Sequence, residues 1–182
     1  RDFGLLRLSS LVDENDNDVP VGQPGEALLK GPLVTRGYHN NPEANATGFT
    51  KDGWYRTGDV MQFGENSDLL YVVGRTKDII NHNGLKIAPA ELEEVLCEHP
   101  FIADAAVVGI QDQETEVPRA FVALRPRVEA SQKTAEDIQS YVKQRVSDRK
   151  QLRGGVVFVE SVPRLLSGKV WRAKLKEMVV SQ

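Results

Sequence analysis

Two sequence patterns meet at Gly74-Arg75-Thr76-Lys77-Asp78-Ile79-Ile80, and this stretch decides how the fold is divided. Before it, turn residues alternate with short apolar runs, which is typical of irregular β structure. After it, longer apolar strands alternate with amphipathic helices, which is typical of a small α/β unit. The sequence therefore predicts an α+β chain in which a β-rich part over residues 1–76 is followed by an α/β part over residues 77–182.

The β-rich part contains few clear elements. A strand is expected over Gly25–Lys30, and a hairpin is expected from residues 58–63 and 69–73. One or two helical turns are expected over residues 42–47, because Asn41 can cap the helix and Pro42 suits its first position.

The α/β part gives stronger signals. Asn83-Gly84 predicts a tight hairpin between residues 78–80 and 85–87. Continuous apolar runs over residues 105–110 and 120–124 predict strands that are either covered on both faces or part of a sheet backed by helices, and residues 156–159 predict a third apolar strand. Apolar residues at helical spacing predict helices over residues 89–97, 134–146 and 170–179, the second of them capped by Thr134.

Composition limits the possible functions. The 182 residues carry a formal net charge of −3, which gives no reason to expect nucleic acid or an anionic membrane as a partner. The longest apolar stretches are strand-sized, so no membrane span is expected. Cys97 is the single cysteine, which excludes an internal disulfide and fits a reducing compartment. The three histidines show no metal-like spacing, so no protein-held metal is expected.

The motif Gly53-Trp54-Tyr55-Arg56-Thr57-Gly58-Asp59 supplies the first candidate site residue, Asp59. A carboxylate on a rigid turn can accept hydrogen bonds from both hydroxyls of a ribose, and Arg75 could donate to the same sugar or to its phosphate. The alternatives remain open at this point. Asp59 could be a structural turn residue, and Arg75 could form an ion pair with Asp78 or Glu91.

Three further candidates lie in or near turns. Lys77 is either a solvated linker residue or a hinge. Gly84 serves the predicted hairpin, and it would also allow a ligand to approach the backbone closely. Lys169, in Ser167-Gly168-Lys169, is either a surface lysine or a mobile charge suited to developing negative charge, because the glycine spacing of a P-loop is absent.

Five co-linear motifs together resemble the C-terminal portion of the adenylate-forming enzymes, the superfamily of acyl-CoA synthetases, aryl-CoA ligases, firefly luciferase and peptide-synthetase adenylation domains. The residues that carry the resemblance are Gly37-Tyr38 with Asn41-Pro42-Glu43-Ala44, Gly53–Asp59, Gly74–Ile80, Gly84–Glu93 and Ser167-Gly168-Lys169. The run Ala88-Pro89-Ala90-Glu91-Leu92-Glu93 is more similar to the 4-coumarate-CoA-ligase-like and medium-chain acyl-CoA synthetases than to peptide-synthetase domains.

The resemblance implies a role for each candidate. Asp59 and Arg75 would bind the nucleotide, and Lys77 would be the hinge between the large and the small domain. Lys169 would be the catalytic lysine that contacts the substrate carboxylate and the α-phosphate, and Gly84 with Leu85 would line the passage for the CoA pantetheine. Residues 1–76 would be the β-barrel-like end of the large domain, and residues 77–182 the mobile small domain. Asn81 and Asn83 stand where the family often has basic residues, a departure that bears on thioester formation.

The whole protein implied by the resemblance is a ligase that uses ATP, Mg²⁺ and CoA to activate a carboxylic acid, in fatty acid or phenylpropanoid metabolism. Alternatives are an enzyme that loads a carrier protein, a luciferase-like oxygenase, and a non-catalytic binding module. The chain begins at Arg1 and lacks the family's phosphate loop, so it is expected to be part of a longer protein and inactive alone. A cytoplasmic or peroxisomal location is expected, although the C-terminal Ser181-Gln182 is not a Ser-Lys-Leu signal.

Overall fold

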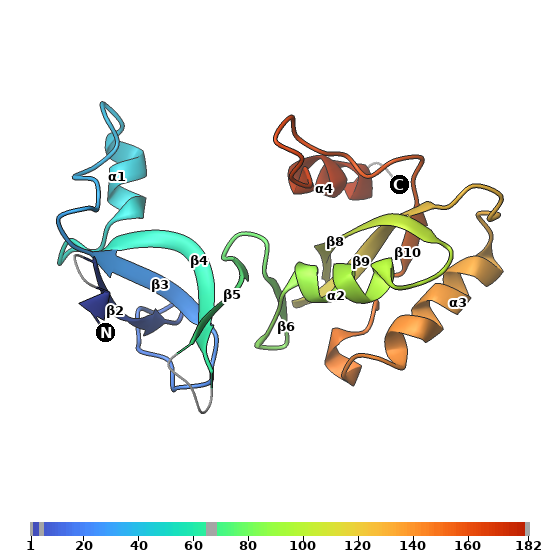
Figure 1. The fold of residues 1–182 in the computed structure, drawn as a ribbon, viewed down its shortest axis with the longest axis horizontal. Helices are drawn as coiled ribbons and strands as arrows, with labels where there is room; N and C mark the ends of the chain where they lie inside the picture. Colours follow the sequence, from blue (N-terminus) through green and yellow to red (C-terminus); the bar gives the residue numbers. More distant parts are fainter. Residues whose placement is uncertain (1, 4–5, 65–68, 181–182) are drawn as a thin grey trace. The chain divides into compact units, whose positions relative to one another are not determined.

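The computed structural model describes residues 2–3, 6–64 and 69–180 (Figure 1). The chain divides into two compact units, Arg1–Lys77 and Asp78–Gln182, so the boundary falls after Lys77, whereas the sequence placed it before that residue. The first unit is mostly sheet and the second mixes helices with sheet, which confirms the α+β class. The assignment of the units to a large and a small catalytic domain stays a prediction.

The first unit is built on a sheet of five strands that follow one another in chain order and pair antiparallel. The strands are β1 (Asp2–Phe3), β2 (Leu6–Val12), β3 (Gly25–Lys30), β4 (Tyr55–Phe63) and β5 (Leu70–Arg75). The predicted strand over residues 25–30 and the predicted β4–β5 hairpin are both present, while residues 65–68 of the hairpin loop lie outside the described part. Leu11 and Ala27 form the buried core of the unit, with Leu29, Met61 and Phe63 packed against them.

The barrel-like geometry expected for this region is not found among the described residues. β1 and β5 lie at the two ends of the strand order and are not paired with each other, so the sheet is open. Closure would need a ladder of hydrogen bonds between these two edges. The helix α1 (Pro42–Gly48) agrees with its prediction, because the Asn41 side chain accepts the amide hydrogen of Ala44 at 3.0 Å and Pro42 occupies the first turn.

The second unit begins with a short hairpin, β6 (Ile80–His82) and β7 (Leu85–Ile87). Asn83 has φ 49° and Gly84 has φ 78°, the two positive values that a tight type I′ turn requires. The Thr115 hydroxyl holds the turn, since it accepts the Asn83 amide hydrogen at 2.8 Å and donates to the Asn81 carbonyl at 3.1 Å. The predicted Asn-Gly hairpin is therefore confirmed.

A three-stranded sheet forms the centre of the second unit. Its order is β10-β9-β8, from β8 (Ile102–Asp112), β9 (Thr115–Leu124) and β10 (Val156–Phe158), with β8 antiparallel and β10 parallel to β9. Three α-helices accompany it: α2 (Pro89–Cys97), α3 (Gln132–Lys143) and α4 (Arg172–Val180) (Figure 1). A short 3₁₀ turn spans Asp148–Lys150.

Both faces of this sheet are covered, as the continuous apolar runs predicted. Val107 and Val122 pack with residues of α2 and α3 on one face, whereas Val108 and Phe121 pack with Leu175 of α4 on the other. Neighbouring residues of a strand point to opposite faces, so an unbroken apolar run fills two cores at once.

Two helix starts differ from their predictions. The cap of α3 is Ser131 rather than Thr134, because the Ser131 side chain accepts the Thr134 amide hydrogen at 3.2 Å, while the Thr134 hydroxyl donates to the Glu129 carbonyl at 2.8 Å. The helix accordingly starts and ends earlier than predicted. The last helix starts at Arg172, after the predicted Val170, because Val170 instead pairs with Arg164 in an isolated β-bridge.

Candidate functional site

The first site is built on a bulge in β4. Leu28 pairs with Arg56 and Glu26 with Val60, so Ala27 alone on β3 faces a longer segment, Thr57-Gly58-Asp59, on β4. Gly58 has φ 68°, a left-handed conformation that costs other L-residues roughly 1–2 kcal/mol. Bulges of this kind redirect a side chain, and here the residue that is redirected is Asp59.

Side chains replace the ladder hydrogen bonds that the bulge interrupts. The Glu26 carboxylate accepts the Gly58 amide hydrogen at 3.1 Å. The Thr57 hydroxyl donates to the Ala27 carbonyl at 2.9 Å and accepts the Asp59 amide hydrogen at 3.0 Å. The Gly58 carbonyl accepts from the Thr76 amide at 2.8 Å. The backbone around Asp59 is thus fixed from both neighbouring strands, which gives the carboxylate a defined position.

Asp59 and Arg75 lie directly opposite each other on β4 and β5. Arg75 Nη1 donates to Asp59 Oδ1 at 2.6 Å and to the Thr57 carbonyl at 3.2 Å. The side chains are 31% and 53% exposed, so the pair contributes at most about 1 kcal/mol and can adjust to a ligand. Asp59 Oδ2 has no hydrogen bond to the described residues, and it is available to a diol. Glu91, which the sequence offered as a partner of Arg75, binds Lys150 at 2.7 Å instead.

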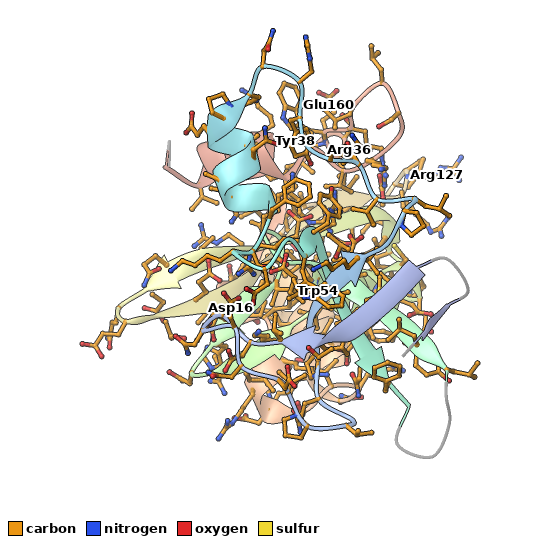
Figure 2. The ribbon with its side chains drawn as sticks, turned by 90° about the vertical axis from the view of Figure 1, so that its left-hand side faces the viewer. Asp16, Arg36, Tyr38, Trp54, Arg127 and Glu160 are labelled. Atoms are coloured by element: carbon orange, nitrogen blue, oxygen red, sulfur yellow. The ribbon has the colours of Figure 1, made fainter. Side chains whose placement is uncertain are left out.

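Glu26 is a neighbour of the candidate site that the sequence did not reveal. Its second oxygen accepts from Arg56 Nη1 at 3.0 Å, and Arg56 also binds Asp16 in the loop between β2 and β3 (Figure 2). The hydrogen bond to Asp16 is the main cause that raises the pKa of Arg56, so this guanidinium remains charged. Glu26 lies 32 residues before Gly58, and no local pattern links the two.

Two tyrosine hydroxyls lie close together near the start of β4, the strand that carries Asp59. The hydroxyls of Tyr38 and Tyr55 are 3.2 Å apart, and Tyr38 lies on the segment that leads into α1 (Figure 2). The hydrogen bond between Tyr55 and Tyr38, followed by burial, raises the pKa of Tyr55. Tyr55 is therefore neutral near pH 7, and its hydroxyl remains a hydrogen-bond donor at the start of the strand that carries Asp59.

We expect Glu26→Ala to lower the free energy of unfolding of the first unit by about 1–3 kcal/mol, because it leaves the Gly58 amide without its acceptor and removes one of the two carboxylates that bind the half-buried Arg56. Urea unfolding followed by Trp54 fluorescence in a Trp171→Phe background reports on this unit alone, since the chain has one tryptophan in each unit. Glu14→Ala, at an exposed glutamate of the same unit, is the matched control. Equal effects of the two substitutions would contradict the role given to Glu26.

The remaining candidates lie at the boundary and in the second unit. Lys77 is the last residue of the first unit, and its exposed side chain has no hydrogen bond or ion pair within the described ranges. Gly84 is exposed, and no atom lies within 4 Å of the position that a Cβ would take there. Leu85 follows it, half-buried, on β7. A ligand could therefore approach the backbone at Gly84 without displacing a side chain.

Lys169 lies on a second tight turn. Arg164 pairs with Val170, the Leu165 amide donates to the Lys169 carbonyl at 2.8 Å, and Gly168 has φ 82°. The Lys169 side chain is exposed and makes no hydrogen bond or ion pair with any described residue. This hairpin carries Lys169 without an ion-pair partner among the described residues, whereas Asp59 and Arg75 belong to the other unit. Asp59 and Arg75 thus lie together in the first unit, and Lys169 and Gly84 both lie in the second unit.

The described residues contain no group of three or more His, Cys, Asp or Glu side chains that could hold a metal ion. Among the helices of the described ranges, none has the length and apolar character needed to cross a membrane.

Comparison with known proteins identifies the relatives of the chain. A family model, the AMP-binding enzyme C-terminal domain, matches residues 91–169. A putative acyl-coenzyme A synthetase of Emericella nidulans is 44% identical over 94% of the chain and 30% of its own length. The 4-coumarate–CoA ligase-like 6 protein of Arabidopsis thaliana is 42% identical over 90% of the chain and 28% of its own length.

A solved structure of a CoA ligase has a similar fold. The benzoate CoA ligase from Burkholderia xenovorans LB400 matches 94% of the chain and 34% of its own length, with a TM-score of 0.77 and 32% identity. The chain therefore spans about a third of the length of the proteins that it resembles.

Proposed function

The chain belongs to the adenylate-forming enzymes and matches their C-terminal portion, and on this premise we propose that the intact protein is an ATP-dependent carboxylate–CoA ligase. In the first half-reaction the substrate carboxylate attacks the α-phosphorus of ATP, which gives acyl-AMP and pyrophosphate. In the second, the CoA thiol attacks the acyl carbonyl and AMP leaves. The observation that carries the proposal for this chain is the Asp59–Arg75 pair, which the β4 bulge holds in place.

The proposed nucleotide contacts follow from the chemistry of that pair. A carboxylate has about four acceptor positions, and Arg75 uses one of them, so two ribose hydroxyls can donate to Asp59 while the ion pair persists. Arg75 has several donors on its guanidinium, and it is suited to assist at the sugar or the phosphate. The half-exposed position of both side chains supports access for a ligand.

The proposed roles of the second unit use its two turns. Lys169, an exposed cation on a hairpin, would neutralise charge that develops on the α-phosphate and carboxylate oxygens during adenylation. Gly84, which lies beside open space, and Leu85 would line the passage of the CoA pantetheine after the small domain has turned about Lys77. Charge stabilisation and thiol attack would then take place in two different conformations.

ATP and CoA are the proposed substrates, together with a carboxylic acid. Mg²⁺ belongs to the proposal only as a counter-ion of the ATP phosphates, since the described side chains offer no cluster to hold it. An intracellular location, cytoplasmic or peroxisomal, agrees with these substrates and with the single cysteine.

Carboxylate-dependent exchange of pyrophosphate into ATP by the intact protein tests the proposal, with aliphatic and aromatic acids as probes. We expect exchange with at least one class of acid, and formation of its CoA thioester when CoA is added. Exchange without thioester would favour a carrier-protein acceptor or a luciferase-like oxygenation. If no acid supports exchange, the family-derived activity is absent, and the non-catalytic binding module becomes the better explanation.

We expect the isolated 182-residue chain to form no acyl-AMP, because it spans about a third of the length of its relatives, and Asp59, Arg75 and Lys169 alone cannot position ATP and a carboxylic acid. Purified chain and intact protein would be compared at equal concentration in the same exchange assay. Activity of the isolated chain above that of a Lys169→Ala version of itself would contradict this expectation and the domain assignment.

A further inference from the structure

We infer that Arg164 is a positioning residue for Lys169, and that it acts through its ion pair with Asp104. This inference rests on the proposed function, because it assigns a role within the adenylation step. It concerns two residues that neither the sequence patterns nor the family resemblance singled out.

The geometry places Arg164 between the sheet and the Lys169 turn. Asp104 lies on β8, and its carboxylate accepts three hydrogen bonds from the guanidinium: Nη2 to Oδ1 at 2.8 Å, Nη2 to Oδ2 at 3.0 Å and Nε to Oδ2 at 3.2 Å. The remaining nitrogen, Nη1, donates to the Gly168 carbonyl at 2.8 Å. One planar group therefore connects the strand to the residue that directly precedes Lys169.

Asp104 is itself held in place. Its Oδ1 also accepts the amide hydrogen of Ala105, at 3.0 Å, in a strand that is buried over Ala105–Val108. The carboxylate is therefore attached to a strand that the core of the second unit holds in place. Arg164 connects this strand to a turn which otherwise depends on a few backbone hydrogen bonds, such as Gly168 to Leu165 at 2.8 Å.

An arginine is needed for this arrangement. Its fork lets it bind a carboxylate along one edge and a carbonyl with another nitrogen, whereas the ammonium of lysine is a single point on a flexible stem. Because a catalytic group that is misplaced by about 1 Å can lose about 10²-fold in rate, fixing the Gly168 carbonyl matters for a cation that must meet developing charge. The ion pair is surface-exposed, 42% for Arg164 and 34% for Asp104, so its loss has little effect on folding.

The test uses the intact protein and measures both half-reactions: pyrophosphate exchange, and thiolysis of pre-formed acyl-AMP. We expect Arg164→Ala to lower the kcat of adenylation by about 10- to 100-fold, with little change in the KM for ATP or in thiolysis. Asp104→Ala should have a similar effect, and Arg164→Lys an intermediate one. Arg153→Ala removes the comparable exposed pair with Asp148 in the same unit and should leave both half-reactions unchanged.

The deciding measurement is the double variant Arg164→Ala/Lys169→Ala. If Arg164 acts through Lys169, the double variant should be no slower than Lys169→Ala alone. Independent, multiplying effects would overturn the inference, and so would an equal loss in both half-reactions. If Lys169→Ala slows adenylation and Arg164→Ala does not, only this inference fails. If Lys169→Ala has no effect on a protein that adenylates, the catalytic role proposed for Lys169 fails as well.

Discussion

Lys169→Ala in the intact protein is expected to slow adenylation by about 10²- to 10³-fold, the usual effect of losing one group that stabilises developing charge. Thiolysis of pre-formed acyl-AMP should be much less affected, because in the proposed mechanism the small domain has turned before the thiol attacks and Lys169 no longer contacts the reacting groups. The asymmetry between the two half-reactions is the essential result. It follows from a lysine that is exposed on a turn and makes no hydrogen bond within the described residues, so that it is available to a ligand.

Both half-reactions are measured on the same enzyme preparation, and circular dichroism verifies the fold. Lys176→Ala, at an exposed lysine of α4, is the matched control and should react at the wild-type rate. Equal losses of adenylation and thiolysis would mean that Lys169 supports folding or general binding. The two-conformation mechanism would then lose its main support.

Lys77→Pro in the intact protein is expected to separate the two half-reactions, with adenylation surviving better than thiolysis. Proline fixes φ near −65°, and a residue that absorbs the rotation between two domain positions cannot then reach both. The order of the two effects follows if the domain position that adenylates is the one compatible with the φ that proline imposes at Lys77. Lys77 suits the experiment because it ends the first unit, and its amide makes no backbone hydrogen bond within the described part of the chain.

Lys77→Ala keeps the backbone free to rotate and removes only the side chain, so it separates the effect of φ from that of charge. We expect the alanine variant to react at nearly the wild-type rate in both steps. A folded Lys77→Pro protein with two wild-type rates would place the pivot elsewhere, at Thr76 or Asp78, and would leave Lys77 as a solvated linker residue.

Local signals explain which parts of the fold could be predicted from the sequence. Asn83-Gly84 and the Asn41-Pro42 pair specify their elements through backbone preferences alone, and both elements are present as expected. The α3 cap was assigned to Thr134 from its Thr-x-x-Asp pattern, yet the cap is Ser131, because the cap depends on where the chain enters the helix. The open sheet of the first unit could not be foreseen, because closure depends on how distant edge strands meet.

The candidate site likewise contains residues that the sequence predicted and residues that it did not. Asp59 and Arg75 were predicted to act on one sugar, and they face each other because they occupy adjacent strands of one hairpin. Glu26 and Asp104 were missed, since their partners lie 32 and 60 residues away in the sequence. Short-range patterns reveal the groups proposed to touch the substrate, whereas the groups that orient them come together only in the folded chain.

The β4 bulge also bears on how such a site tolerates insertions and deletions. Where Ala27 alone lies between two paired residues of β3, β4 has Thr57, Gly58 and Asp59, so the bulged strand contains two more residues than a regular ladder would. Side chains alternate between faces with a period of two, so an even insertion leaves the strand on both sides of it in phase. Tyr55 opposite Leu29 and Met61 opposite Gly25 are separated by an even number of residues on each strand, and they keep a common face. The Asp59 segment is thus a unit that a lineage could gain or lose without rebuilding the core beneath it.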